Sequence, residues 1–452
     1  MKKRFVLGNL IYYLDENKVF LMNLVNFRRQ KVDKEFISTI IEIERKINNG
    51  LALSEKENRI INDLYEKRQV LKKDALLEIE QIFIDKAELS MEKFPVKSIM
   101  LNLTYECNFR CLYCYQNKYK DRPEYKQFMT IEDIDLIKKY LSQDYLDVTE
   151  MDEVSLSGGE SLLPQNIDTI NYVLKNFNPK EFIIFTNGVN LYEYRNYIDY
   201  NLVNKFQISL DGTAEIIKYI NQNSDPSVLN KVIDGIKHIE SLNKEITIAV
   251  MLTKELVQNI DKFVDILQKN NIIGKSNINI RFSLVIDNFS KNTIDYSFYD
   301  LDYLCSEVKN LNLKLAKIGS FVEVYREGIS LNHLIHRTVN KKSYIKDRTC
   351  DFTKAVPMNF VPNGDVFWCV CLGHENGRIG NYKENIYFDK EKVLKLGNRT
   401  IFKIEKCKTC DIKYICAGGC PLPLTSCDSD FNVPVCGLYG LDEFWERLEE
   451  LI

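Results

Sequence analysis

The sequence predicts an α/β fold that is preceded by a small module and followed by a cysteine-rich region. Apolar runs alternate with amphipathic helical patterns from residue 97 to about residue 290, no cysteine precedes Cys107, and nine of the thirteen cysteines lie between residues 350 and 436. A chain of 452 residues is long enough for roughly two to four units that each bury a core. We expect three segments, at 1–95, 96–310 and 311–452.

The first segment has the pattern of a separate α+β module. Strand candidates at 4–14 and 19–27 flank a turn-like "DENK", and helical patterns follow at 34–47, 55–71 and 75–89. Strands followed by helices, rather than alternating with them, are typical of α+β units.

The second segment alternates strands and helices. The apolar runs are at 98–105, 153–157, 181–187, 205–210, 245–253 and 277–286, and helical patterns between them include 130–142, 226–242 and 255–270. Six such repeats indicate parallel strands joined by crossover helices. We expect the chemistry at the carboxyl ends of these strands.

Composition excludes some partners and favours metal or redox chemistry. A net charge of −3 provides no basic surface for nucleic acid, and no apolar run approaches the roughly 20 residues that span a bilayer, so we expect neither nucleic acid nor membrane as a partner. The N-terminus has no signal-cleavage site, which predicts a cytoplasmic protein. Clustered cysteines in a reducing compartment are more often metal ligands than disulfides.

Three cysteines directly follow the first strand of the repeat, at Cys107, Cys111 and Cys114. A four-iron cluster needs four ligands, so three thiolates leave one iron open for a small molecule. Zinc is the alternative, but it fits less well because the chain has only four histidines to complete such a site.

The spacing Cys-x3-Cys-x2-Cys, with Tyr113 before the last cysteine, resembles the signature of radical S-adenosylmethionine (radical SAM) enzymes. The resemblance covers about residues 97–290. It implies a partial (β/α)6 barrel, with a [4Fe–4S] cluster whose open iron binds S-adenosylmethionine and cleaves it to a 5′-deoxyadenosyl radical.

Three further segments resemble cofactor-binding parts of that family. "SGGE" after the second strand is similar to the segment for the methionyl amino group and provides Ser157, Gly158, Gly159 and Glu160. "ISLDG" is similar to the ribose-binding segment, which implies contacts from Ser209 and Asp211, and Asn187 of "TNG" is expected on the same face. Each stretch is also compatible with a simple turn. Relatives often carry an arginine after "SLDG"; this chain has none, and Lys218 or Arg281 is the candidate substitute.

The third segment resembles the seven-cysteine SPASM extension of radical maturases. That resemblance implies two auxiliary iron–sulfur clusters, hence three [4Fe–4S] clusters in all. Cys350, Cys369 and Cys420 would bind the first auxiliary cluster, and the second would be bound by Cys407, Cys410, Cys416 and Cys436.

The first auxiliary cluster is one thiolate short by this pattern, because Val356 stands where relatives carry a further cysteine. Cys371 or Cys427 completes it, or the site is open and accepts a substrate thiolate. Cys305 is expected to be a core thiol. Val370 stands where relatives that mature sulfatases carry an aspartate, which disfavours that reaction.

The first segment resembles the winged-helix-like peptide-recognition element of ribosomal-peptide maturases, with three strands and three helices. Such elements bind a leader peptide as an added strand. A plain helical extension is the alternative.

Together these features predict a maturase that takes hydrogen from a ribosomally made precursor peptide with a leader and installs an intramolecular cross-link. A thioether is preferred and a carbon–carbon bond is next. Maturation of a folded protein or quinone-cofactor precursor is the alternative, and a non-enzymatic iron–sulfur protein is the least favoured. The family also implies an electron donor such as flavodoxin or ferredoxin.

Overall fold

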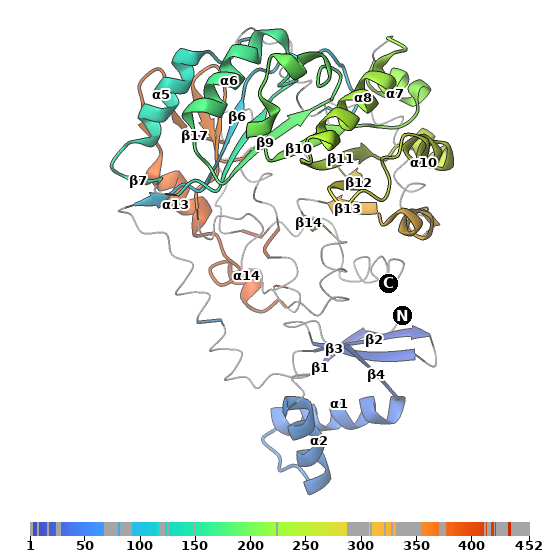
Figure 1. Cartoon of the computed structure of the whole chain (residues 1–452). Coiled ribbons are helices and arrows are strands. Elements are labelled where there is room, and N and C mark those ends of the chain that lie inside the picture. Colours follow the sequence, from blue (N-terminus) through green and yellow to red (C-terminus); the bar gives the residue numbers. More distant parts are fainter. Residues whose placement is uncertain are drawn as a thin grey trace.

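The fold was determined as a computed structural model (Figure 1). The structure describes residues 3–6, 9–15, 18–23, 29–66, 80–81, 93–114, 116, 123, 126–148, 150–222, 225–286, 307, 310–320, 322–326, 329–330, 355–369, 377–410, 413, 417–419, 421 and 433–434.

In the described residues, the N-terminal module is a four-stranded antiparallel sheet followed by two helices. Its elements are β1 (Lys3–Val6), β2 (Asn9–Asp15), β3 (Lys18–Asn23), β4 (Arg29–Val32), α1 (Lys34–Asn48) and α2 (Glu55–Glu66), and the strand order is β1-β2-β3-β4. The sequence predicted fewer strands. The first apolar run forms two strands, β1 and β2, and the largely polar β4 gave no strand signal in the sequence. Most of the third helical pattern, 75–89, lies outside the described residues.

The module has a core of its own. Asp33 caps α1 by accepting a hydrogen bond from the Phe36 amide, and the apolar residues of α1 then recur on one face of the helix. The buried residues are Leu21, Val32, Ile37, Ile40, Ile43, Ile61 and Leu64.

Within the part of the chain that the structure describes, the main sheet has twelve strands in the order β14-β13-β12-β11-β10-β9-β8-β6-β15-β16-β17-β18. The six predicted strands lie side by side and parallel in chain order, as the sequence analysis expected. They are β6 (Ser98–Asn102), β8 (Glu153–Ser157), β9 (Glu181–Thr186), β10 (Lys205–Ser209), β11 (Glu245–Met251) and β12 (Ile278–Ile286). A separate two-stranded sheet pairs β5 (Phe94–Pro95) with β7 (Leu146–Asp147). Closure of the main sheet into a partial barrel stays a prediction.

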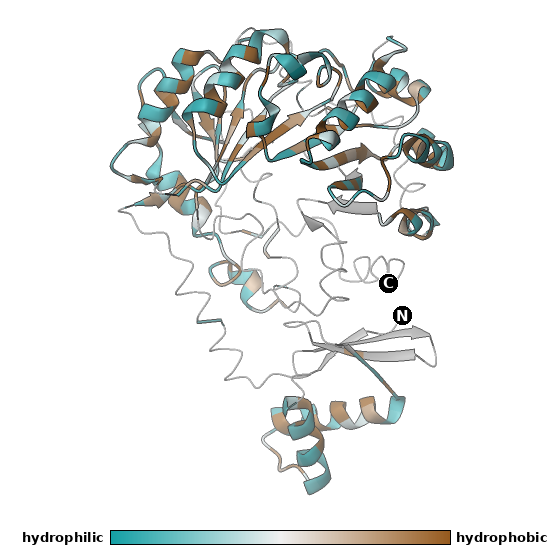
Figure 2. Ribbon diagram, viewed as in Figure 1, coloured by the Kyte–Doolittle hydropathy of each residue, from teal (hydrophilic) through white to brown (hydrophobic). Residues whose placement is uncertain are grey.

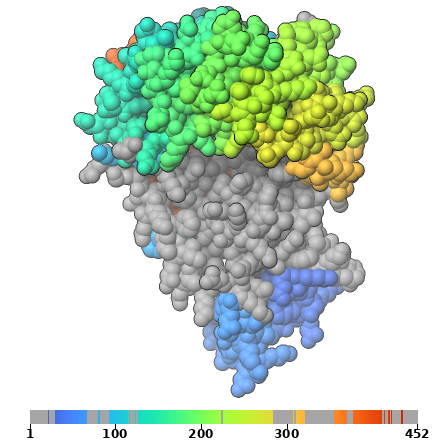
Figure 3. All heavy atoms as spheres, viewed as in Figure 1, coloured from blue at the N-terminus to red at the C-terminus, as the bar shows by residue number. Residues whose placement is uncertain are grey.

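Amphipathic helices connect these strands and turn apolar residues toward the sheet (Figure 2). They are α5 (Ile131–Leu141), α6 (Ile167–Asn176), α7 (Ala214–Ile220), α8 (Val228–Ser241), α9 (Lys254–Gln258) and α10 (Ile260–Lys269), with short 3-10 turns at Pro164–Asn166, Glu193–Asn196, Tyr200–Leu202 and Ala316–Ile318. The single helix expected at 255–270 is two helices. Asn259 breaks it, since its side chain bonds back to the Glu255 carbonyl (2.9 Å) and its backbone leaves helical geometry. Figure 3 shows residues from α5 to α10 as one continuous surface.

The C-terminal segment extends the main sheet on both sides. β13 (Val322–Arg326) and β14 (Ile329–Ser330) continue it beyond β12, while β15 (Met358–Phe360), β16 (Asp365–Phe367), β17 (Arg378–Asn381) and β18 (Tyr387–Phe388) continue it beyond β6. Helices α13 (Lys390–Gly397) and α14 (Glu405–Lys408) follow. Buried residues of β15, β16 and α13 belong to the same core as β6 and β8. The boundary expected near residue 310 stays a prediction, although the sheet runs across it.

None of the helices in the described ranges is long and apolar enough to cross a membrane.

Candidate functional site

The three cysteines of the first cluster motif lie on one loop at the carboxyl end of β6. The loop is fixed to the end of α7, because the amides of Arg110 and Leu112 donate to the carbonyls of Asn221 and Ile220 at 3.0 and 2.9 Å. Cys107, Cys111 and Cys114 are all half-buried. The Phe109 amide donates to the Cys107 sulfur at 3.3 Å, an interaction that favours a thiolate.

The three thiols lie on one loop, but their sulfur atoms do not converge on a single metal ion. In the described part of the chain, no three Cys, His, Asp or Glu side chains converge closely enough to hold a metal ion. The donor set nevertheless fits an iron–sulfur cluster, since three thiols on a short loop with amide donors to sulfur are the ligands such clusters use.

Gly158 and Gly159 bring the end of β8 directly against the backbone that leads into the cysteine loop. A Cβ on Gly158 would lie 2.3 Å from the Thr104 oxygen, and a Cβ on Gly159 would lie 2.2 Å from the Glu106 oxygen. The Gly159 amide donates to the Thr104 carbonyl at 2.6 Å. The glycine pair is therefore required by backbone contact, which positions the residue just before Cys107.

Glu160 is fully engaged inside the protein. Its carboxylate accepts hydrogen bonds from the Thr186 hydroxyl (2.6 Å) and from the amides of Leu162 (2.8 Å) and Asn187 (2.7 Å). Burial raises its pKa, and these donors act in the opposite direction. The Glu160 side chain joins the ends of β8 and β9. The sequence did not indicate this role, and it did not indicate Thr186 as a site residue.

Asn187 connects the hydrogen bonds of Glu160 to the cysteine loop. Its side-chain nitrogen donates to the Asn108 oxygen at 2.6 Å and lies 4.0 Å from the Cys107 sulfur. The role of Asn187 in cofactor binding stays a prediction.

Tyr113 and Asp211 meet across the site. The Tyr113 hydroxyl donates to Asp211 at 2.5 Å, and the other carboxylate oxygen accepts from the Met251 amide at 3.1 Å. Burial raises the pKa of Asp211 to about 6, against hydrogen bonds that lower it. Burial, followed by the charge of Asp211, raises the pKa of Tyr113. The strand-end aspartate is thus tied to the cysteine loop.

The sheet register distinguishes the two candidate cations. Ser209 on β10 pairs with Ala249 on β11, which pairs with Arg281 on β12, and residues paired in this way point to the same face. The Arg281 guanidinium donates to the Gln207 amide oxygen on that face at 3.0 Å. Lys218 is exposed on α7. Arg281 therefore shares the face of the ribose-type segment.

Ser157 ends β8 and is half-buried.

The described tail cysteines occupy three places. Cys369 follows β16, Cys407 is buried in α14, and the Cys410 amide donates to the Cys407 carbonyl at 3.1 Å. Val356 is fully buried in the main core, and its amide donates to the Pro95 carbonyl at 2.7 Å. The expectations for Cys305, Cys350, Val370, Cys371, Cys416, Cys420, Cys427 and Cys436 lie outside the described residues.

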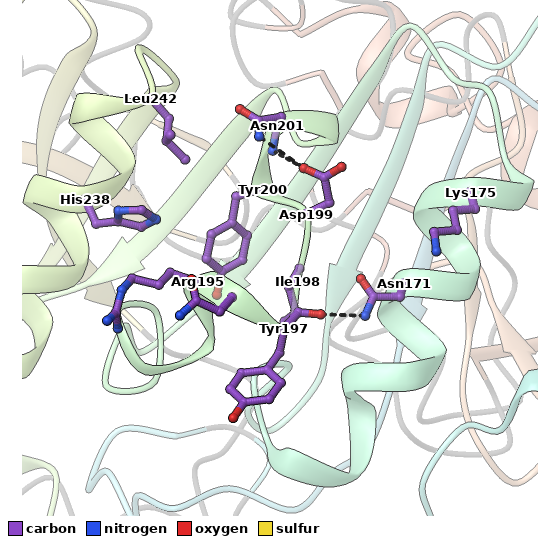
Figure 4. A pocket seen from close by; sticks show the side chains of 11 residues that line it. Asn171, Lys175, Arg195, Tyr197, Ile198, Asp199, Tyr200, Asn201, His238 and Leu242 are labelled. Carbon is purple, nitrogen blue, oxygen red and sulfur yellow. Dashed lines mark hydrogen bonds between the residues drawn. The ribbon is translucent and has the colours of Figure 1, made fainter.

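A surface pocket of about 390 Å³ lies away from these residues. It is formed by α6, α8 and the connection between β9 and β10, and residues such as Lys175, Arg195, Tyr200 and His238 line it (Figure 4). None of the predicted site residues contributes to it.

Parallel strands with crossover helices, a cysteine loop and polar side chains at the strand ends are the arrangement that α/β enzymes use to bind a cofactor. Residues 101–268 match the model of the Radical SAM superfamily. The chain therefore contains a radical SAM domain over these residues. This family implies one [4Fe–4S] cluster and S-adenosylmethionine.

Similar proteins extend the comparison beyond that domain. The chain is 23% identical over 438 residues to the radical SAM cyclopropyl synthase TigE of Paramaledivibacter caminithermalis, covering 90% of this chain and 87% of that protein. It is 24% identical to a cysteine-type anaerobic sulfatase-maturating enzyme of Clostridium novyi, over 70% of this chain and 84% of that one.

Among solved structures, Streptococcus suis SuiB bound to S-adenosylmethionine has a similar fold. The TM-score is 0.51 at 17% identity, and the similarity covers 96% of this chain and 100% of that one.

Proposed function

We propose that the protein is a radical SAM maturase that modifies a ribosomally made precursor peptide. The observation that carries the proposal is an N-terminal module with its own core ahead of the radical SAM domain. The similarity to TigE, which covers 90% of the chain, supports a maturase with this whole organisation.

When bound, S-adenosylmethionine would supply a 5′-deoxyadenosyl radical that takes a hydrogen atom from the peptide. Cys107, Cys111 and Cys114 would each ligate one iron of the cluster. Asp211 would accept hydrogen bonds from the ribose hydroxyls, and Arg281 is the candidate partner of the cofactor carboxylate. Glu160 would hold the surrounding backbone in place.

The cysteine-rich tail would hold two auxiliary [4Fe–4S] clusters with the ligands assigned by resemblance. A peptide cross-link formed with loss of two hydrogen atoms releases a second electron after the first hydrogen has been taken. An iron–sulfur centre would be a suitable acceptor for that electron and could pass it back to the cluster that cleaves S-adenosylmethionine. An external donor such as flavodoxin or ferredoxin would supply the electron that first reduces that cluster.

A thioether from a cysteine sulfur to a carbon is the proposed bond. Val356 is packed in the core, which supports the view that this position supplies no ligand to the first auxiliary cluster. A substrate thiolate would then be a suitable fourth ligand. A carbon–carbon bond is the second candidate, because a cyclopropyl synthase such as TigE must form one.

Two rival substrates remain within the same class. Similarity to a sulfatase-maturating enzyme favours a folded protein, whereas Val370 and the extra module disfavour that reaction. A quinone-cofactor precursor is the other alternative. A passive iron–sulfur protein conflicts with the radical SAM match.

The cysteine loop provides the first test. Replacement of Cys107, Cys111 and Cys114 by alanine should abolish cleavage of S-adenosylmethionine and remove about one third of the iron after anaerobic reconstitution, because one of three clusters is lost. An unchanged iron content would contradict the assignment.

The module provides the second test. A chain lacking residues 1–92 retains Phe94, which belongs to the main core, and Pro95, whose carbonyl accepts a hydrogen bond from the Val356 amide. It should still cleave S-adenosylmethionine without peptide but bind the precursor encoded beside it at least about tenfold more weakly, since strand addition to the module provides affinity. Equal affinity of both proteins, measured by fluorescence anisotropy, would reject the leader-binding role.

Mass spectrometry identifies the bond. Either cross-link removes two hydrogen atoms, but only a thioether also removes a cysteine that iodoacetamide can alkylate.

A further inference from the structure

Asn187 is held in one orientation at the end of β9, and its side chain is only 9% exposed. Its backbone amide donates to the Glu160 carboxylate at 2.7 Å, and its side-chain oxygen accepts from the Val189 amide at 3.1 Å. A backbone amide can only donate, so the atom that accepts from Val189 must be the oxygen. The side-chain nitrogen is therefore the end that faces the cysteine loop.

The turn that carries Asn187 is fixed by packing as well as by hydrogen bonds. Gly188 has a φ of 80°, and a Cβ added to it would lie 2.8 Å from Ile208 Cγ2. Its amide donates to the Thr186 hydroxyl oxygen at 3.0 Å, and that hydroxyl donates to Glu160 at 2.6 Å. The direction of the Asn187 side chain is therefore determined by buried groups around it.

The Asn187 nitrogen has two hydrogens and lies near two acceptors of the cysteine loop. It donates to the Asn108 side-chain oxygen at 2.6 Å and lies 4.0 Å from the Cys107 sulfur. Contacts to sulfur are longer than contacts to oxygen because sulfur is the larger atom. The same sulfur accepts from the Phe109 amide at 3.3 Å. Asn187 is thus placed as a second donor to Cys107.

One residue holds both sides of this contact. The Glu160 amide donates to the carbonyl of Glu106, the residue directly before Cys107, at 2.9 Å. The Glu160 carboxylate accepts from the Asn187 amide. The separation between the Asn187 nitrogen and the Cys107 sulfur is therefore set by the buried Glu160.

We propose that Asn187 is a positioning residue that donates a hydrogen bond to the Cys107 thiolate and raises the reduction potential of the cluster held by that thiolate. The inference rests on the proposed function, which assigns Cys107, Cys111 and Cys114 to one four-iron cluster. Reduction makes a thiolate-bound cluster more negative. A donor aimed at one of its sulfurs stabilises that added charge, so the reduced form is favoured.

The experiment uses the full chain, reconstituted anaerobically, as wild type, Asn187→Leu, Asn187→Ala and Asn190→Leu. A fifth protein, with Cys107, Cys111 and Cys114 replaced by alanine, identifies the signal of the cluster in question by its loss. Redox titrations followed by electron paramagnetic resonance give the midpoint potential of that signal. They are made without S-adenosylmethionine, so the potential does not depend on any contact of Asn187 with the cofactor. Iron content and thermal melting are measured on the same samples.

Asn190 provides the matched control. It lies in the same turn, but its side-chain nitrogen donates to the Leu162 carbonyl at 2.7 Å rather than to the cysteine loop. Leucine has nearly the volume of asparagine and no donor, so each leucine variant loses one amide group while the space stays filled. In Asn187→Ala, by contrast, a water molecule has room to donate to the sulfur in place of the lost amide.

We expect both Asn187 variants to keep the iron content of the wild type, because all three thiols remain. The potential of the identified cluster should shift to more negative values in Asn187→Leu, and by a smaller amount in Asn187→Ala. Asn190→Leu should lower the melting temperature and leave the potential unchanged.

Two results would overturn the inference. The first is a wild-type potential in Asn187→Leu, or in Asn187→Ala if the leucine variant does not fold. The second is an equal shift in Asn190→Leu, which would show that any disturbance of this turn changes the potential. A wild-type protein without a signal that the triple cysteine replacement removes would instead contradict the cluster assigned under the proposed function.

Discussion

The N-terminal module and the C-terminal segment flank the same radical SAM domain but are built in different ways. The module encloses its own core between α1, α2 and its sheet. Strands β15 to β18 and α13 instead contribute to the main core, and β15 pairs in parallel with β6, the strand that precedes the cysteine loop. The module therefore has a core of its own, whereas the C-terminal strands share the main core, and we predict that the module is separable from the radical SAM domain.

Among the substitutions that test this difference, Phe360→Ala on β15 should cause the largest loss of stability. Phe360 is fully buried, and its ring contacts Tyr140 and Tyr382 at centroid distances of 5.9 and 5.7 Å. Replacement of a buried phenylalanine by alanine lowers the free energy of unfolding by about 3–5 kcal/mol. In this case the loss should fall on the radical SAM domain itself. Calorimetry should show a lower melting temperature of the main transition.

Ile40→Ala is the matched change in the module, since Ile40 is 1% exposed within the separate core. It should lower only a module transition. If Ile40→Ala lowers the main transition as much as Phe360→Ala does, the two regions form one cooperative unit and the comparison fails.

Gly159→Ala tests the backbone contact beside the cysteine loop. Its Cβ would meet backbone oxygens, which cannot rotate away, so we expect a cost at or above the usual ~1–3 kcal/mol of overpacking, with reduced cofactor cleavage. Gly50→Ala in the module is the control. Gly50 has a φ of 66° and nothing within 4 Å of an added Cβ, so only conformational strain of about 1 kcal/mol applies. Similar melting temperatures for both variants would contradict the close contact.

Two carboxylates give the regions opposite pH responses. Burial raises the pKa of Asp211 to about 6, so the folded state holds its proton more tightly and stability falls as pH rises from about 4 to 6. Hydrogen bonds from Lys46 and then Ser54 lower the pKa of Glu57 to about 2, so its contribution is present above about pH 4.5 and is lost as pH falls toward 2.

Asp211→Asn should remove the first response. The ionised carboxyl costs at most about 3 kcal/mol at pH 7, and roughly half of that cost is already present at pH 5. The variant should therefore gain about 1 kcal/mol of relative stability between pH 5 and pH 7. Thermal melts across this range measure it. A difference between variant and wild type that does not change with pH would show that Asp211 has an ordinary pKa.

The main sheet was predictable because its signals are local. Each of the six strands is a short apolar run at a regular distance from an amphipathic helix, and Thr130 with Asp133 even forms the capping box that starts α5. The cysteine spacing and the glycine pair likewise stand in the sequence as short patterns. Because parallel strands end at the same edge of a sheet, the cysteine loop and the glycine pair were expected at that edge.

The remaining features depend on contacts between distant residues. Nothing near Glu160 indicates that Thr186 and the Asn187 amide would occupy its carboxylate, and nothing near Arg399 indicates that its guanidinium donates to the Val433 carbonyl. The polar β4 acquires its structure from pairing with β3, and the C-terminal strands join the main sheet through β6. Long-range pairing of this kind leaves no local sequence signal.

An ion pair between the two flanking regions gives the smallest expected effect and the sharpest test. Lys413, between Cys410 and Cys416, lies 2.9 Å from the carboxylate of Glu80, which belongs to the first segment and comes after α2. Both side chains are largely buried, at 13% and 16% exposure. The exposure of this pair is intermediate between that of a surface ion pair and that of a fully buried one, so a coupling of about 1 kcal/mol is expected.

A double-mutant cycle with Glu80→Gln and Lys413→Met measures that coupling free of the other contacts of each side chain. Lys395→Met is the control, because its pair with Glu391 is 60% and 79% exposed within α13 and should contribute little. If the cycle gives a coupling near zero, the regions are independent at this point; if it approaches the effect of Phe360→Ala, the module is not separable and its deletion would disturb the cysteine-rich loops directly.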